Sequence, residues 1–276
     1  MGRIEMRWNR KHLVFGICIC VAFVLFSAFV GAGVASATTW HVDDDLVQRP
    51  DANFTSIQDA VDAASPGDTI LVYPGTYTEN VDVNKDHLTI KSEGGAKTTI
   101  IQAKNPDDHV FEVTADYVNI SGFRVKGLGG DGGLLGGIYL HASYCNIFNN
   151  SILNCENGIL LDDALNNSLI SNNCSNNHWG ILLRNSANNT LVDNEVSTNR
   201  WCGIDLYFSP INELSGNNMD NNRYYNFGVS GTIRDFVQYI DISNKVDGKP
   251  IYYLIGEKDK TIDSTKYLDK SNLTCS

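Results

Sequence analysis

Six side chains of the kinds that bind sugars recur at nearly regular intervals in the second half of the chain. Phenol rings stack on pyranose rings, whereas guanidinium and carboxylate groups bond hydroxyls or uronate carboxylates. The set consists of Tyr139, His141, Asp162, Arg184, Asp205 and Tyr207. Four of its members follow one another at intervals of 21, 22 and 23 residues (141, 162, 184, 207). On stacked strands, such a set would form an outward surface for a polysaccharide or cell-surface glycan.

The same residues also fit a solvated face without a ligand. There, Asp162 and Arg184 would form a cross-strand ion pair that contributes about 0.2–1 kcal/mol. Glycoside hydrolysis ordinarily requires two carboxylates across the scissile bond, yet the adjacent Asp162 and Asp163 face opposite sides of a strand. β-Elimination of uronates uses a base and usually a bound calcium, and no acidic triplet falls in one column. The catalytic residues are therefore unassigned, and a polysaccharide lyase or glycoside hydrolase is the alternative to a non-catalytic binder.

The residue content offers few soft metal ligands. Copper prefers sets of Cys, Met and His, but Met219 is the one methionine after residue 37 and the histidines show no ligand spacing. The run Asp43-Asp44-Asp45 permits a calcium site, although such a run is also typical of a solvated acidic turn. We therefore predict no metal site and no cofactor, with calcium left open and copper unsupported.

These side chains must be positioned by an internal repeat. Gly137, Gly158, Gly180 and Gly203 each begin a unit of about 22 residues, and each is followed by alternating apolar residues. Units of this length are too short for helix pairs and match the coils of a parallel β-solenoid. We therefore predict an all-β fold, a right-handed parallel β-helix whose coils stack about 4.8 Å apart.

A second column of the repeat contains asparagine. Asn150, Asn172, Asn194 and Asn217 occupy it, each followed two residues later by an apolar residue or cysteine. Stacked asparagines bond through their amides, so we predict a structural asparagine ladder. Glycine is expected at the turns, where a positive φ or close backbone approach is needed.

The region before the repeat predicts a cap and looser strands. A helix is expected over about 55–64, with Thr55 and Gln58 as a capping box. Its apolar face is suited to cover the first coil, because a solenoid end must be shielded from water. The strands expected upstream of the repeat are 68–73, 80–83, 87–91, 98–102, 110–113 and 117–125.

Several motifs resemble those of a known family. Trp-His-Val-Asp-Asp-Asp at 40–45, Phe-Thr-Ser-Ile-Gln-Asp-Ala-Val at 54–61 and Pro-Gly-Thr-Tyr at 74–77 resemble the N-terminal cap of pectin-lyase-like β-helix proteins. The Asn-rich coils are similar to the carbohydrate-binding and sugar-hydrolase (CASH) repeats of NosD-like proteins and archaeal cell-surface proteins. The segment 246–253 looks like the insertion that follows those repeats. The resemblance implies the β-helix fold and, as a weaker functional alternative, an accessory role in copper-enzyme maturation.

Composition and the first segment bear on location. The 32 acidic against 21 basic residues, a net charge of −11, argue against nucleic acid and anionic lipid as partners. Residues 1–37 combine a basic start, an apolar run at 13–30 and Ala-Ser-Ala at 35–37. This pattern is typical of a signal peptide or, if uncleaved, an N-terminal membrane anchor. Either way, residues 38–276 are expected outside the cytoplasm, secreted or at the cell surface.

The predicted organisation has three parts. The export segment 1–37 is followed by the β-helix over 38–227, with the Asn-rich repeats at 137–227. The segment 228–276 is expected to be a small C-terminal module or a truncated continuation of the β-helix. Its exposed end is expected to be covered by further chain or by self-association.

Overall fold

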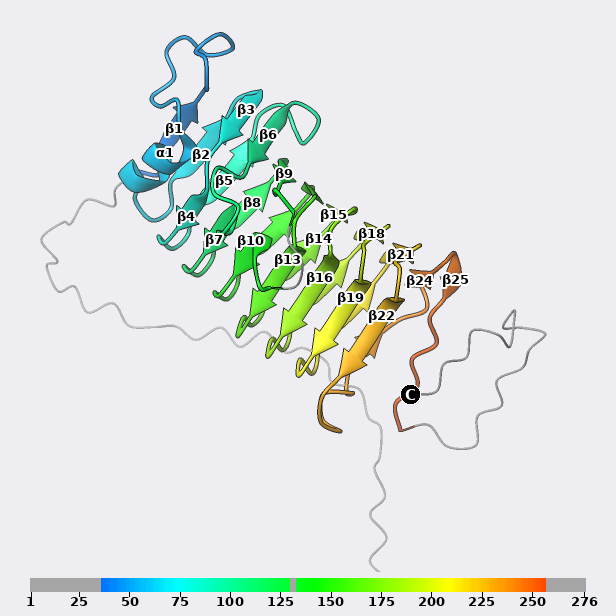
Figure 1. Cartoon of the computed structure of the whole chain (residues 1–276). Helices are drawn as coiled ribbons and strands as arrows, with labels where there is room; N and C mark the ends of the chain where they lie inside the picture. Colours follow the sequence, from blue (N-terminus) through cyan, green and yellow to red (C-terminus); the bar gives the residue numbers. More distant parts are fainter. Residues whose placement is uncertain (1–35, 130–132, 257–276) are drawn as a thin grey trace, which may run out of the picture. The chain divides into compact units, whose positions relative to one another are not determined.

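The computed structural model of the chain describes residues 36–129 and 133–256. Each repeat contributes one strand to each of three sheets before the next repeat begins, so the sheets surround one shared core (Figure 1). The solenoid has about eight turns of about 23 residues. The predicted right-handed parallel β-helix is confirmed. Residues 1–35 of the predicted export segment lie outside the described residues.

Sheet A contains the first described strand, β1, and extends along the solenoid to β23. Its strands pair in the parallel sense in the order β1-β2-β5-β8-β11-β14-β17-β20-β23. Their bounds are β1 Thr39–Val42, β2 Thr69–Val72, β5 Thr89–Ser92, β8 Asn119–Ser121, β11 Asn146–Phe148, β14 Ser168–Ile170, β17 Thr190–Val192, β20 Glu213–Ser215 and β23 Tyr239–Ile240.

Sheet B follows sheet A around each coil. It consists of β3 Gly75–Thr78, β6 Thr99–Gln102, β9 Arg124–Lys126, β12 Ser151–Leu153, β15 Asn173–Cys174, β18 Glu195–Ser197, β21 Asn218–Asp220, β24 Lys245–Val246 and β25 Lys249–Pro250. All neighbours are parallel except β24 and β25, which form an antiparallel hairpin. Asp247 and Gly248 connect them, both with positive φ, as the tightest hairpin turns require.

Sheet C closes each coil and carries the candidate site. It consists of β4 Val81–Val83, β7 Phe111–Val113, β10 Gly136–Leu140, β13 Asn157–Asp162, β16 Trp179–Arg184, β19 Cys202–Tyr207 and β22 Tyr225–Ser230. Side chains at equal positions of successive coils form columns. Ile138, Ile159, Ile181 and Ile204 make one such inward column, and all four are completely buried. Burying apolar surface at about 25 cal/mol per Å2 makes this core the main source of stability.

Asparagine ladders line all three corners of the coil, whereas the sequence predicts a single ladder. The predicted ladder lies between sheets A and B, where Asn172 Oδ1 accepts hydrogen bonds from the backbone N–H and Nδ2 of Asn150. This ladder also includes Asn194, Asn217 and Asn244. The second ladder lies between sheets C and A and consists of Asn167, Asn189 and Asn212. The third ladder lies between sheets B and C and consists of Asn177, Asn199 and Asn222.

The corners themselves correct the expectation about glycine. The residue before each ladder asparagine except Asn244 lies in the left-handed region, and most of these residues are not glycine. They are Asn149, Asn166, Ser171, Asn176, Asn188, Asp193, Thr198, Ile211, Gly216 and Asn221. Asparagine and aspartate tolerate this backbone conformation better than other side chains, which accounts for much of the asparagine in the repeat.

The repeat-start glycines serve close approach instead. A Cβ on Gly180 would lie 2.2 Å from Val196 Cγ1 and 2.6 Å from Gly203 O. Gly158 and Gly203 are equally crowded by the next coil. Only glycine therefore permits the coils to stack at this column.

The helix α1 (Ile57–Ala63) covers the first coil, but its cap differs from the prediction. The N-cap is Ser56, one residue after Thr55. Glu79, at the end of β3, accepts hydrogen bonds from Ile57 N–H and Gln58 N–H through its two carboxylate oxygens. Gln58 instead donates to Asp62 within the helix. A carboxylate distant in sequence has replaced the local capping box.

The strands show one further departure and one continuation of the solenoid. The expected strand 117–125 is split into β8 and β9, because Gly122 adopts φ +79° and turns the chain from sheet A to sheet B. After Gly228 the chain still supplies β23 and β24, which pair in parallel with β20 and β21. Within residues 36–129 and 133–256, no helix is long and apolar enough to cross a membrane.

Candidate functional site

The outer face of sheet C, here called the C face, carries the six predicted ligand-binding residues. Asp162, Arg184 and Tyr207 are direct neighbours on β13, β16 and β19. His141 follows the end of β10 and reaches the next coil, where its Nδ1 lies 2.8 Å from Asp162 O. Because the apolar positions alternate with these residues and point inward, the four side chains occupy one outward column.

Asp162 and Arg184 form a two-point ion pair. Arg184 Nε lies 2.8 Å from Asp162 Oδ1, and Arg184 Nη2 lies 3.0 Å from Asp162 Oδ2. The hydrogen bond to Asp162 raises the pKa of Arg184 further. The two bonds hold the guanidinium in place. Because a guanidinium has five N–H donors, the others remain available to a ligand. Its side chain keeps 35% of its exposure.

A row of aromatic rings lies beside this pair. His109 stacks on Tyr139 with ring centroids 4.1 Å apart, and Tyr139 and His141 are nearly parallel at 6.5 Å. Gly136 N–H donates to His109 Nδ1, which must therefore be unprotonated in that bond. Burial lowers the pKa of His109 and raises the pKa of Tyr139, so both rings stay uncharged near neutral pH. His109 and Tyr139 therefore present flat, uncharged rings with polar edges.

His109 was not predicted as a site residue. It lies two residues before β7, in the upstream region where the repeat is irregular. The register Phe111–Ile138 places β7 next to β10 and brings His109 beside Tyr139. The sequence did predict a strand at 110–113, which could have pointed to His109. The sequence alone did not show that this strand belongs to sheet C.

Acidic groups surround the ring row. Asp82, Glu112 and Tyr139 are successive members of one outward column on β4, β7 and β10. Burial and the nearby Asp82 and Asp108 raise the pKa of Glu112. This end of the C face therefore has negative charge that disfavours a polyanion.

Asp205 lies apart from the ring row and is only 6% exposed. It accepts a hydrogen bond from Tyr225 Oη at 3.1 Å, and burial raises the pKa of Asp205. The Tyr225 ring crosses the position where a Cβ of Gly228 would stand. Leu160 and Leu182 are buried between Asp205 and Tyr139 in the same column.

The predicted site residues Asp162 and Asp205 do not lie across a common bond. Asp162 and Asp205 lie on strands two coils apart, about 9.6 Å at the usual strand spacing, and two residues apart along the strand. Asp162 is also committed to Arg184. Tyr207 is 44% exposed and packs edge-on against Phe208. The geometry therefore suits contact with an extended ligand better than general acid–base catalysis by this pair.

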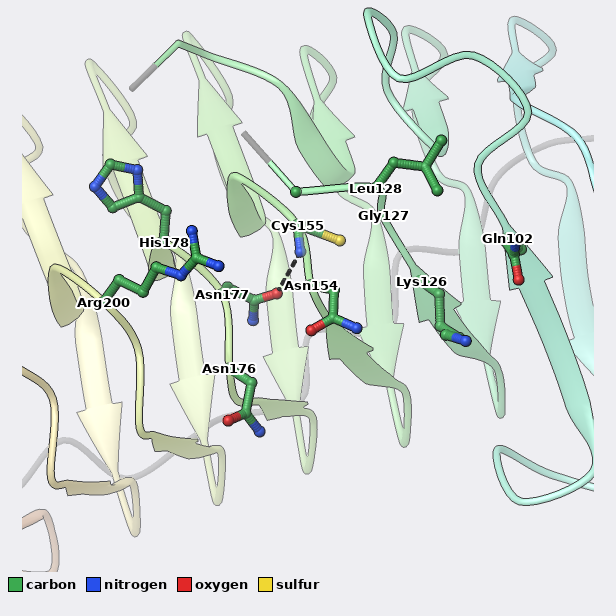
Figure 2. Close-up of a pocket in the computed structure, with 11 residues that line it drawn as sticks. Gln102, Lys126, Gly127, Leu128, Asn154, Cys155, Asn176, Asn177, His178 and Arg200 are labelled. Atoms are coloured by element: carbon green, nitrogen blue, oxygen red, sulfur yellow. Dashed lines mark hydrogen bonds between the residues drawn. The ribbon is translucent and has the colours of Figure 1, made fainter. Parts of the chain in front are cut away.

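A separate cavity of about 350 Å3 opens at the corner between sheets B and C. Figure 2 shows basic and amide side chains around it, drawn from several successive coils. Its lining consists of Gln102, Lys126, Gly127, Leu128, Gly129, Asn154, Cys155, Asn176, Asn177, His178 and Arg200. The sequence did not predict this cavity, because part of its wall comes from Gly127, Leu128 and Gly129, which precede the regular repeat.

The acidic run near the N-terminus is the one cluster of potential metal ligands among the described residues. Its carboxylates already accept backbone hydrogen bonds. Arg49 N–H donates to Asp43, Thr76 N–H to Asp44, and Val47 N–H to Asp45. These bonds explain the run as part of the N-terminal turn structure.

The described side chains do not fit a copper site. The four cysteines of this region are buried, and burial raises their pKa values. Met219 is completely buried in the core. His109 and His141 use Nδ1 within the protein, and the acidic cluster offers only hard oxygen donors. Copper prefers softer nitrogen and sulfur sets, and these side chains do not supply one.

Comparison with known proteins gives one curated relative and several solved folds. A cell surface glycoprotein of Methanothermus fervidus is 41% identical over 104 residues, which are 37% of this chain and 16% of the glycoprotein. The chain thus corresponds to a small part of that relative.

The solved structures share the fold at low sequence identity. The alginate lyase of Paenibacillus sp. FPU-7 superposes with a TM-score of 0.62 at 17% identity, covering 76% of each chain. The pectate lyase Pel9A gives 0.57 at 18% identity, covering 69% of this chain and 55% of the lyase. At such identities, these likenesses establish a pectate-lyase-like β-helix and nothing about activity.

The family model described as "Periplasmic copper-binding protein (NosD)" matches residues 61–235. The match begins in α1, includes the ladder asparagines from Asn150 to Asn222 and ends after β22. Because it spans more than half of the chain and agrees with the observed architecture, the chain belongs to the NosD family of parallel β-helix proteins.

Proposed function

We propose that this protein works outside the cytoplasm, at the cell surface, and binds a glycan along the C face without cleaving it. The surface location is supported by the name of the Methanothermus relative and by the periplasmic description of the family. The net charge of −11 supports a soluble outer surface that does not adhere to nucleic acid or anionic lipid.

The observation that carries the proposal is the ring row beside the ion pair. His109 and Tyr139 are stacked within 4.1 Å, and the Asp162–Arg184 pair lies in the column that also contains His141. Pyranose rings pack their C–H faces on such rings, while charged groups bond their hydroxyls. The parallel sheet presents these groups on a rigid, extended surface, which matches a chain-like ligand.

The charges on the face indicate which glycans to try first. Asp82, Asp108 and Glu112 lie near the rings, whereas Arg184 is neutralised by Asp162. A neutral polysaccharide avoids the repulsion that a polyuronate would meet here. We therefore expect neutral glycans to bind more tightly than polyuronates on the C face.

The test is retention of the full chain by a panel of neutral and uronate polysaccharides in affinity electrophoresis. We expect His141→Ala, Arg184→Ala and Tyr207→Ala each to weaken retention about tenfold, equivalent to about 1.4 kcal/mol. Tyr144→Ala is the matched control, because Tyr144 is 47% exposed against 44% for Tyr207 and stacks on Tyr117 in the connection between sheets C and A, outside the strands of the C face. Unchanged retention in the three variants would eliminate the C face as the binding surface.

The same panel also tests the catalytic alternative. Release of new reducing ends, with and without calcium, detects both hydrolysis and elimination. No release from the folded protein is expected. Release that disappears in Arg184→Ala would instead identify a lyase or hydrolase that uses this face.

A further inference from the structure

The cavity between sheets B and C has a charge opposite to that of the molecule. Lys126, His178 and Arg200 are in its lining, and none of the eleven lining residues is acidic. The whole chain carries a net charge of −11. A basic concavity in an acidic protein concentrates field lines and attracts anions locally.

Several polar groups in the cavity remain available to a ligand. In the described part of the chain, the side chains of Gln102, Lys126 and Asn154 make no hydrogen bond or ion pair. His178 Nδ1 is buried and likewise lacks a hydrogen-bond partner there. Buried polar atoms are ordinarily paired, so these groups suit a polar ligand.

Other lining groups hold the cavity in shape. Asn177 belongs to the third ladder: its Oδ1 accepts from Cys155 N–H and its Nδ2 donates to Ile152 O. A Cβ on Gly127 would lie 2.7 Å from Asn154 O, so the Gly127 backbone packs directly on the next coil. Gly129 N–H also donates to Asn154 O at 2.7 Å. The wall is therefore preorganised, which lowers the cost of binding.

The register of sheet B places the cationic groups along one edge. Lys126 pairs with Gln102 on β6 and with Leu153 on β12, and Arg200 comes from a coil further along the solenoid. Figure 2 shows Lys126 and Arg200 at opposite ends of the row of asparagines that includes Asn154. A ligand between them would meet positive charge at its ends and amides along its length.

We propose that this cavity binds one acidic sugar unit through its carboxylate. Its volume of about 350 Å3 is at the lower end of ligand pockets, about 300–1,000 Å3, and suits a monosaccharide. Lys126 or Arg200 supplies charge-assisted hydrogen bonds to the carboxylate. Gln102 and Asn154 bond the hydroxyls, and Leu128 packs against the C–H face of the ring. The site lies on other strands than the C face and does not depend on glycan binding there.

The experiment is calorimetric titration of the full chain with D-glucuronate, D-glucose and inorganic phosphate. We expect glucuronate to bind, with an affinity that falls as salt is raised, and glucose to bind at least about tenfold more weakly. Binding of glucose equal to glucuronate would overturn the proposal. Phosphate binding as tight as glucuronate would assign the cavity to phosphorylated ligands and would also overturn the choice of a carboxylate.

Variants locate the binding within the cavity. Lys126→Met and Arg200→Gln are tested separately, and the variant that removes the donor to the carboxylate is expected to weaken glucuronate binding about tenfold or more. Unchanged glucuronate binding in both variants would overturn the proposal. Lys91→Met is the matched control, since it removes the same charge from an exposed position on sheet A. Loss in Lys91→Met equal to that in Lys126→Met would show only a general charge effect.

Discussion

Asp205 shows how one outward residue can lose its contact with water. Its side chain lies on the outward side of β19, yet Tyr225 from the next coil covers it and donates a hydrogen bond to it. The carboxylate was predicted as a ligand-binding group on the same surface as Tyr207. Burial makes it a protected acid instead, with a raised pKa.

The raised pKa of Asp205 leads to a pH-dependent stability. The folded chain holds the proton more tightly than the unfolded chain, whose Asp has a pKa near 3.8. Stability is therefore lost as pH rises from about 3.8 through the folded pKa, by about 1.4 kcal/mol for each pH unit within that window. Asp205→Asn avoids this loss and should gain stability relative to wild type over the same window.

Urea unfolding at several pH values measures this difference. Asp163→Asn is the control, because Asp163 is exposed and asparagine tolerates its positive φ. A stability difference between wild type and Asp205→Asn that does not change with pH would show that Asp205 ionises equally in both states.

At the scale of elements, the N-terminal helix depends on a residue outside it. The Thr55 and Gln58 pattern correctly indicates a helix start, but Ser56 is the cap and Glu79 supplies the acceptors. Local sequence can identify that a helix begins, whereas the acceptor Glu79 lies between β3 and β4 and reaches the helix only after folding. The same reason explains why α1 is correctly predicted and its cap is not.

Replacing the Glu79 cap should destabilise the first coil. In Glu79→Gln, one acceptor oxygen becomes an NH2 group, which cannot accept from the backbone N–H of Ile57 or Gln58. We expect a loss of about 1–2 kcal/mol in the free energy of unfolding, measured by urea titration. Glu93→Gln, at an exposed position, should change stability by less than about 0.5 kcal/mol. Equal stability of the two variants would contradict the capping role.

At the scale of the molecule, the three ladders connect the coils along the solenoid. Each ladder asparagine accepts from the preceding coil and donates a hydrogen bond to a backbone carbonyl of that coil, as Asn194 does with Asn172 and Leu169. Stability in a solenoid is approximately a sum of such neighbour terms. The ladders therefore satisfy buried backbone groups at corners that the sheets cannot reach.

Removing one ladder side chain should have a large effect. Asn194→Ala leaves the N–H of Asn172 and the carbonyl of Leu169 buried without their partners. At about 1–3 kcal/mol for each unsatisfied group, we expect a loss of about 2–5 kcal/mol in the free energy of unfolding. Asn173→Ala, at an exposed position of the neighbouring coil, should cost less than about 0.5 kcal/mol. A small loss for Asn194→Ala would mean that water replaces the ladder bonds.

The repeat made most of the architecture predictable. A constant spacing places equal residues in adjacent coils, so the spacing alone aligns Ile138 with Ile159, which are partners on β10 and β13. The two further ladders were also visible in principle, since Asn167, Asn172 and Asn177 stand five residues apart and recur in the next coil. Outward and inward positions followed from strand alternation.

What tertiary structure added depends on groups that no repeat relates. His109 reached Tyr139 from an irregular upstream coil, Tyr225 folded over Asp205, and the backbone at Gly127 walled off a basic cavity. Periodicity encodes which residues stack, because neighbouring coils have equal lengths. It does not encode which outward side chains are covered or left open, because that depends on loops and side chains that meet only when the coils are assembled.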